Sequence, residues 1–106
     1  MMAILLSSVL VVTAAQSAAV NGARDGLRNC FKEAMAQAKT NKVAKDAFQP
    51  FAKTHCAAQM SSFKAAVWAF DAKNKMSKKQ SNADADLQVE DFLFTADDRY
   101  QREAGQ

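Results

Sequence analysis

The sequence predicts an all-α protein: an antiparallel three-helix domain, with helices at about 23–40, 47–73 and 77–103, one disulfide and a preceding cleavable signal peptide. Three observations support this prediction. Apolar residues recur at intervals of three and four, and no strand-like alternation bounded by turn residues occurs. The first 20 residues carry no charged side chain. Both cysteines lie after this segment, on apolar helix faces.

The N-terminal segment 1–19 has the layout of a secretory signal peptide. Its apolar run from Ala3 to Val12 is interrupted only by two serines, and small residues that suit a signal peptidase follow. The run is shorter than the ~20 residues that a membrane-spanning helix needs. We therefore expect cleavage between Ala15 and Ala19, a periplasmic or secreted protein, and a three-helix domain at 20–106.

The first predicted helix, 23–40, has one apolar face. The residues of this face are spaced by three and one, as one side of a helix requires. They are Leu27, Cys30, Phe31, Ala34, Met35 and Ala38. Asn21 or Asp25 is a suitable N-cap for its start. The polar stretch 39–42 ends the helix.

The second predicted helix, 47–73, contains the only proline, Pro50. Near a helix start the N–H that proline lacks has no intrahelical partner, so Pro50 does not break this helix. Its apolar residues are spaced by three and four and form a seam for packing against a neighbour. They are Ala52, Cys56, Met60, Phe63, Val67 and Phe70.

The third predicted helix, 77–103, begins at a capping box formed by Ser77 and Gln80. Its apolar stripe consists of Ala85, Val89, Phe92, Leu93, Ala96 and Tyr100, with Leu87 and Phe94 beside it. Residues 82–106 carry seven acids and two arginines, whereas residues 20–81 carry 12 Lys/Arg and four acids. These two parts should attract one another, or each should attract a partner of opposite charge.

The two cysteines are predicted to form a disulfide. A short connection between the first two helices makes them antiparallel neighbours, so residues equally far from the turn face each other. Cys30 lies ten residues before Thr40, and Cys56 lies nine residues after Ala47. A Cys30–Cys56 bond suits an exported protein. It is worth about 3 kcal/mol on the chain-entropy model.

Other interpretations of these residues are weaker. His55 and Cys56 project about 100° apart on a helix, and Cys56 with Met60 supplies two of the roughly four ligands of a closed metal site. A catalytic cysteine needs a base directed at its thiolate. The segment 82–93 starts like a calcium loop but has Leu87 and Leu93 where Gly and Glu are required. No metal, cofactor or enzymatic activity is predicted.

Four lysines gather at the second predicted turn: Lys73, Lys75, Lys78 and Lys79. They are either a solvated turn or a contact for an anionic surface such as lipid headgroups. No aromatic residues alternate with them, so a nucleic-acid partner is not predicted. Trp68, close by in the sequence, is either boundary packing or an exposed anchor for a partner.

The stretches "RNCFKEAM", "THCAAQM" and "ADDRYQ", together with the signal peptide, resemble small exported helical proteins of Gram-negative bacteria with no assigned activity. That resemblance implies a periplasmic location and identifies no functional residue. In size, helix content and single disulfide the chain is also similar to acid-stress periplasmic chaperones, in architecture only.

Three functions follow as hypotheses. The first is a non-enzymatic envelope protein that acts by binding a protein or another envelope component, or in a structural role. The second is a chaperone activated when acid protonates the C-terminal carboxylates and frees the third helix. The third is binding of anionic membrane surfaces through the lysines at 73–79. The oligomeric state is not predicted.

Overall fold

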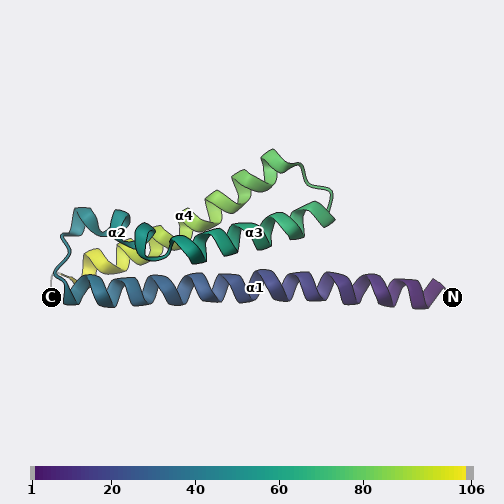
Figure 1. The fold of residues 1–106 in the computed structure, drawn as a ribbon, viewed down its shortest axis with the longest axis horizontal. Helices are drawn as coiled ribbons and strands as arrows, with labels where there is room; N and C mark the ends of the chain where they lie inside the picture. The colour runs from purple at the N-terminus through teal and green to yellow at the C-terminus, as the bar shows by residue number, and fades with distance from the viewer. Residues whose placement is uncertain (1, 105–106) are drawn as a thin grey trace.

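The computed structural model describes the backbone of residues 2–104 and the side chains of residues 17–104. Within that range the chain is helical and has no strand, which confirms the all-α prediction. The elements are α1 (Met2–Thr40), the short 3₁₀ helix η1 (Lys45–Ala47), α2 (Phe48–His55), α3 (Ala57–Lys73) and α4 (Lys78–Glu103). α3 runs back along α1, and α4 returns towards the C-terminal end of α1 (Figure 1).

One hydrophobic core joins the helices, and the predicted apolar faces supply it. All six predicted residues of the first face are buried. α2 and α3 add Phe48, Ala52, Cys56, Phe63 and Val67, and α4 adds Ala85, Val89, Leu93, Ala96 and Tyr100. Most residues of the predicted stripes are therefore buried, whereas Met60, Phe70 and Phe92 are half-buried, so the helical periodicity identified most of the core.

The predicted single helix 47–73 is wrong in one respect, because the structure divides it into α2 and α3 at Cys56. Cys56 leaves the helical region, with φ −109° and ψ 19°. This residue is bonded covalently to α1, so the break lets α2 and α3 pack against α1 and α4 at different angles. No glycine or proline marks the position, and the apolar spacing continues through it.

The predicted helix start near residue 23 is also wrong, because α1 continues through it from Met2. Asn21 and Asp25 therefore do not cap a helix, since the backbone N–H groups there lie within α1. Alanine-rich sequence favours this continuity. The signal peptide at 1–19 stays a prediction, since residue 1 and the side chains up to residue 16 lie outside the described residues.

Two helix ends share one backbone solution. After α1, Lys42 takes a left-handed conformation with φ 55°, and after α3, Lys75 does so with φ 60°. The N–H of Val43 donates to Ala38 O at 2.9 Å, and the N–H of Met76 donates to Asp71 O at 3.0 Å. In each case the N–H donates to the carbonyl five residues earlier, which is the hydrogen bond of the Schellman motif at a helix C-terminus.

The start of α4 follows the predicted cap. The N–H of Gln80 donates to Ser77 Oγ at 3.1 Å, and Ser77 adopts the extended conformation of an N-cap. The side chain of Gln80 accepts from Ser77 Oγ at 3.3 Å. The helix therefore begins where the sequence motif placed it.

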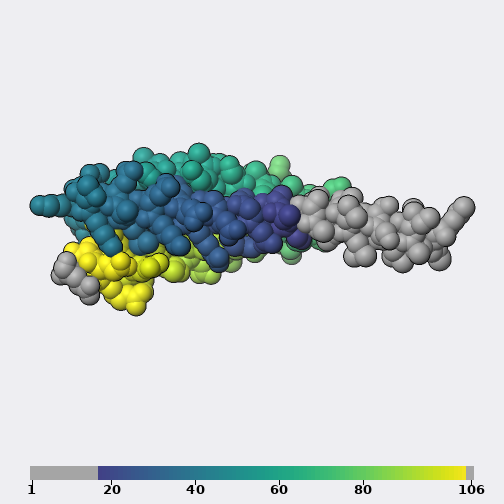
Figure 2. All heavy atoms as spheres, turned by 90° about the horizontal axis from the view of Figure 1, so that it is seen from below, coloured from purple at the N-terminus to yellow at the C-terminus, as the bar shows by residue number. Residues whose placement is uncertain are grey.

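The C-terminal part of α4 lies beside α1 (Figure 2). Tyr100, in this part of α4, is buried. Its ring stacks on Phe48 with centroids 4.4 Å apart. Its hydroxyl lies 3.3 Å from Ala38 O, in the last turns of α1, and 2.5 Å from Val43 O, in the connection that follows α1. One aromatic side chain thus links α1, α2 and α4.

Candidate functional site

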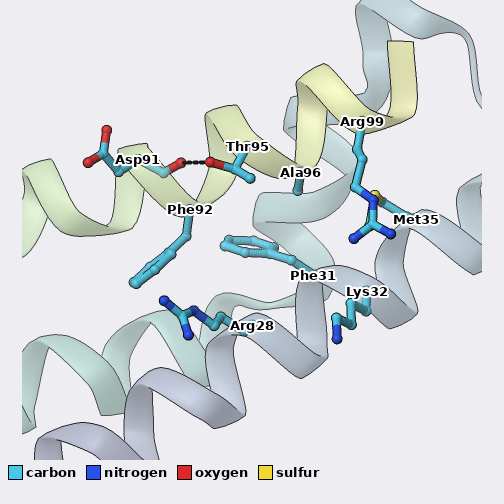
Figure 3. Close-up of a pocket in the computed structure, with 9 residues that line it drawn as sticks. All are labelled: Arg28, Phe31, Lys32, Met35, Asp91, Phe92, Thr95, Ala96 and Arg99. Atoms are coloured by element: carbon cyan, nitrogen blue, oxygen red, sulfur yellow. Dashed lines mark hydrogen bonds between the residues drawn. The ribbon is translucent and has the colours of Figure 1, made fainter. Parts of the chain in front are cut away.

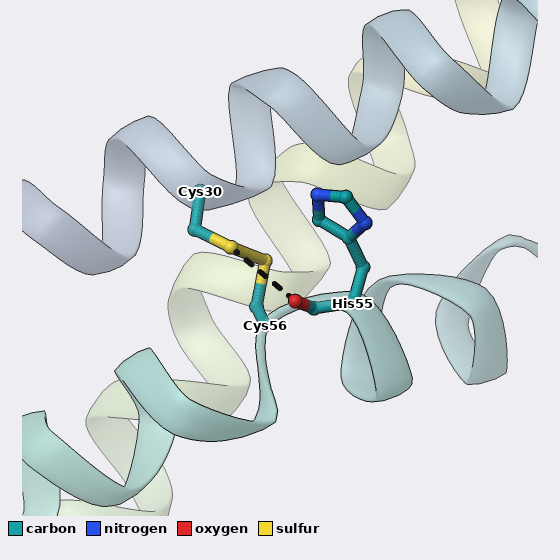
Figure 4. The surroundings of a disulfide bond; sticks show 3 residues. All are labelled: Cys30, His55 and Cys56. Atoms are coloured by element: carbon teal, nitrogen blue, oxygen red, sulfur yellow. Dashed lines mark hydrogen bonds between the residues drawn. A yellow bond between two sulfur atoms is a disulfide. The ribbon is translucent and has the colours of Figure 1, made fainter.

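The disulfide between Cys30 and Cys56 is present, as predicted. The two Cα atoms are 5.8 Å apart, and both residues are buried in the core. Cys30 Sγ lies 3.8 Å from the carbonyl oxygen of His55 (Figure 4). A disulfide sulfur carries no hydrogen, so this is a close contact and not a donated bond. Neither sulfur is a thiolate in this state, and the pair serves to join α1 to the α2–α3 junction.

His55 does not face the sulfur atoms. Its ring points towards α1 (Figure 4) and is stacked with Phe51 at a centroid distance of 6.0 Å. Among the side chains of residues 17–104, no group of three His, Cys, Asp or Glu residues is arranged to hold a metal ion.

The four predicted contact lysines lie together at the turn between α3 and α4. Lys73 ends α3, Lys75 occupies the left-handed position, and Lys78 and Lys79 begin α4. All four side chains are exposed. None forms an ion pair with a carboxylate in the described part of the chain. Their charge is therefore directed into solvent.

Two exposed apolar side chains accompany these lysines. Trp68 is 43% exposed and Met76 is 40% exposed. Together with Ala72, Lys78 and Ser81 they line a mostly apolar hollow of about 310 Å³. We name Trp68, Met76 and the four lysines the lysine tip. Sequence reasoning missed Met76, although the residue that follows a left-handed helix ending is often apolar.

A buried polar contact fixes the lysine tip to the body. Asp71 and Ser81 are both buried, and Ser81 Oγ donates to Asp71 Oδ2 at 2.8 Å. This bond joins the last turn of α3 to the first turn of α4. The turn therefore has a defined shape, because a buried hydroxyl and carboxylate satisfy one another there.

A second concave feature lies between α1 and α4, with a volume of about 520 Å³ (Figure 3). Its apolar floor is formed by Phe31, Met35, Phe92 and Ala96. Three cations stand around it: Arg28 and Lys32 from α1, and Arg99 from α4. We name this the α1–α4 groove. Sequence reasoning missed it, because its two walls come from helices about 60 residues apart in the chain.

Positive charge predominates around the α1–α4 groove. The guanidinium of Arg28 lies 5.1 Å from the centroid of Phe92. Neither Arg28 nor Lys32 has an ion-pair partner among the described residues, whereas Arg99 Nε lies 3.3 Å from Glu103. The carboxylate of Asp91, at the edge, points away from both cations of α1 (Figure 3).

The described residues contain no helix that is both long and apolar enough to span a membrane. Comparisons with protein-family models, with curated proteins and with solved structures find no match to this chain.

Proposed function

We propose that this protein is an exported, non-enzymatic binding protein that contacts anionic membrane surfaces through its lysine tip. One observation carries the proposal: two partly exposed apolar side chains, Trp68 and Met76, lie at the same turn as four lysines that have no carboxylate partner among the described side chains. Solvation of the turn accounts for the four exposed lysines, but it does not account for the exposure of Trp68 and Met76.

The chemistry of this tip fits a membrane interface. Tryptophan prefers the headgroup level of a bilayer, where its ring is in a partly apolar environment and its N–H meets water. Each lysine near an anionic leaflet contributes on the order of 1 kcal/mol, decreasing with ionic strength. Lysine stems can also extend over apolar surface while the ammonium reaches the headgroups.

Two features support export. A buried disulfide is typical of proteins in an oxidising compartment. Among the side chains that the structure describes, Val20 and Ala23 are the first of α1 that pack against the core, so the described residues 17–19 contribute nothing to it.

The test is co-sedimentation of the oxidised protein, residues 20–106, with vesicles. Vesicles containing phosphatidylglycerol should bind it, and pure phosphatidylcholine vesicles should not. Changing Lys73, Lys75, Lys78 and Lys79 to Gln should weaken binding at least about tenfold, because four charges are lost. Binding should also weaken as salt is raised.

The matched control removes four positive charges elsewhere. Lys42, Lys45, Lys53 and Arg102 are exposed and lie away from the lysine tip. Their change to Gln lowers the net charge equally, so it should reduce binding much less. Equal loss in both variants, or binding that does not depend on the four tip lysines, would refute a local membrane contact.

A chaperone activated by acid is the second candidate. The observation that favours it is the attachment of α4 by two ion pairs, Lys39–Glu103 at 2.7 Å and Lys64–Asp86 at 2.8 Å. Protonation of Glu103, whose pKa is lowered first of all by its hydrogen bond from Lys39, would weaken the attachment of the C-terminal end of α4 and favour exposure of its apolar stripe.

A further inference from the structure

We infer that the α1–α4 groove binds a medium-chain fatty acid, with the carboxylate held by Arg28 and Lys32 and the chain laid along the apolar floor. This site is separate from the lysine tip, so it does not depend on the proposed membrane contact. Two properties of the groove carry the inference: its charge and its shape.

The charge selects an anion. Arg28 and Lys32 lie one turn apart on α1 and have no described carboxylate partner. Arg99 adds a third cation from the facing helix. A carboxylate placed between them would accept charge-assisted hydrogen bonds, and arginine can bind it through two N–H groups at once. Asp91, the acid among the residues that line the groove, points away from Arg28 and Lys32 (Figure 3), and Arg99 is already paired with Glu103 at 3.3 Å.

The floor selects a hydrocarbon chain. Phe92 is half-buried, with the Arg28 guanidinium 5.1 Å from its ring centroid, and the nearly buried Phe31 and Met35, 2% and 8% exposed, contribute only their edges to the floor. The volume of about 520 Å³ lies within the range of small-molecule sites, ~300–1,000 Å³. Apolar floor with cations on its rim fits one amphiphilic chain.

The experiment measures binding of dodecanoate, below its micelle concentration, to the oxidised protein by titration calorimetry. Dodecanoate should bind with one-to-one stoichiometry, whereas uncharged dodecanol and chainless acetate should each bind at least about tenfold more weakly. Amide chemical shifts should move at residues of the groove. Absence of saturable dodecanoate binding would overturn the inference.

Matched variants locate the site. Arg28→Gln with Lys32→Gln should weaken dodecanoate binding about tenfold. Lys53→Gln with Arg102→Gln, which also removes one lysine and one arginine, should leave it within about twofold. Thr95→Glu adds a carboxylate at the groove, one turn from Arg99, and should weaken dodecanoate binding. Its control is Thr54→Glu, because Thr54 is an exposed residue of α2 outside the groove, and this change should leave binding unaltered.

Three results would contradict the inference. Equal effects of both charge pairs would indicate non-specific attraction. An undiminished affinity in Thr95→Glu would place the ligand elsewhere. A dimer that dissociates on Arg28→Gln with Lys32→Gln, without any dodecanoate binding, would make the groove an interface between copies of the chain. Circular dichroism of each variant ensures that every one is compared in the folded state.

Discussion

Lys42 and Lys75 hold a backbone conformation that glycine adopts more readily. At both residues φ is positive, 55° and 60°, and each follows an asparagine at a helix end. A side chain in this region costs about 1 kcal/mol, because Cβ approaches the backbone. Glycine avoids that contact, although it loses more entropy on folding.

We therefore expect Lys42→Gly and Lys75→Gly each to raise the free energy of unfolding by up to about 0.5–1 kcal/mol. Urea denaturation of the oxidised protein measures this change. The alanine variants serve as the control, since they remove the charge and keep Cβ, and they should not be stabilised. Glycine variants less stable than the alanine variants would show that these positions are not strained.

At the scale of elements, α4 combines a buried apolar face with carboxylates that pair with neighbouring helices, and an acid response requires both. Its inner face packs in the core, whereas Leu87 and Phe94 on its outer face are 67% and 61% exposed. Near its end Lys39 donates to Glu103 at 2.7 Å. This hydrogen bond lowers the pKa of Glu103 below its ordinary 4.5. Desolvation opposes the shift, and the charges of Lys39 and Arg99 add to it.

The lowered pKa of Glu103 determines how pH changes the stability of the fold. A carboxylate with a lowered pKa stabilises the fold when it is ionised, so its contribution is present above about pH 4.5 and is lost as pH falls further. We expect amide hydrogen exchange in the last turns of α4 to accelerate more than elsewhere as the pH falls from about 4.5 to about 3, after correction for intrinsic rates. Client binding should appear over the same interval if the chaperone hypothesis holds.

Glu103→Gln should shrink this pH effect, because the variant lacks the titrating group. Glu33→Gln is the matched control, since Glu33 is exposed on α1 and forms no ion pair with a described residue. A protein that keeps α4 protected at about pH 3 and ignores unfolded clients would rule out the chaperone candidate.

The elements also show what the sequence could and could not predict. The spacing of apolar residues identified most of each buried helical face, and the Ser77 and Gln80 motif identified the start of α4, because both are local properties of the chain. The break at Cys56 was missed because it depends on a bond to α1. The α1–α4 groove was missed for a similar reason: single-helix patterns contain no information on which exposed cations of two helices meet.

At the scale of the whole molecule, the disulfide supplements a limited core. The structure measures 62 × 24 × 20 Å, an elongated shape with much of its surface exposed to water. A domain of this size has only a few kcal/mol of net stability. The bond closes a sequence separation of 26 residues and should contribute about 3 kcal/mol.

Reduction, or the double change of Cys30 and Cys56 to Ala, should therefore lower the free energy of unfolding by about 3 kcal/mol. Urea denaturation of the oxidised, reduced and alanine forms checks this. The reduced form separates the effect of the covalent link from the loss of sulfur packing, because it retains both side chains. Similar stability of the oxidised and reduced forms would show that the core alone holds α1 against α2 and α3.

The chain contains one tryptophan and one tyrosine, and the fold places them in different regions along its length. Trp68 belongs to the lysine tip, and Tyr100 is sealed among α1, α2 and α4. The protein therefore carries two native optical probes. A change in indole emission without a change in phenol absorbance would report an event at the turn, and the reverse would report opening of the far end, without any label.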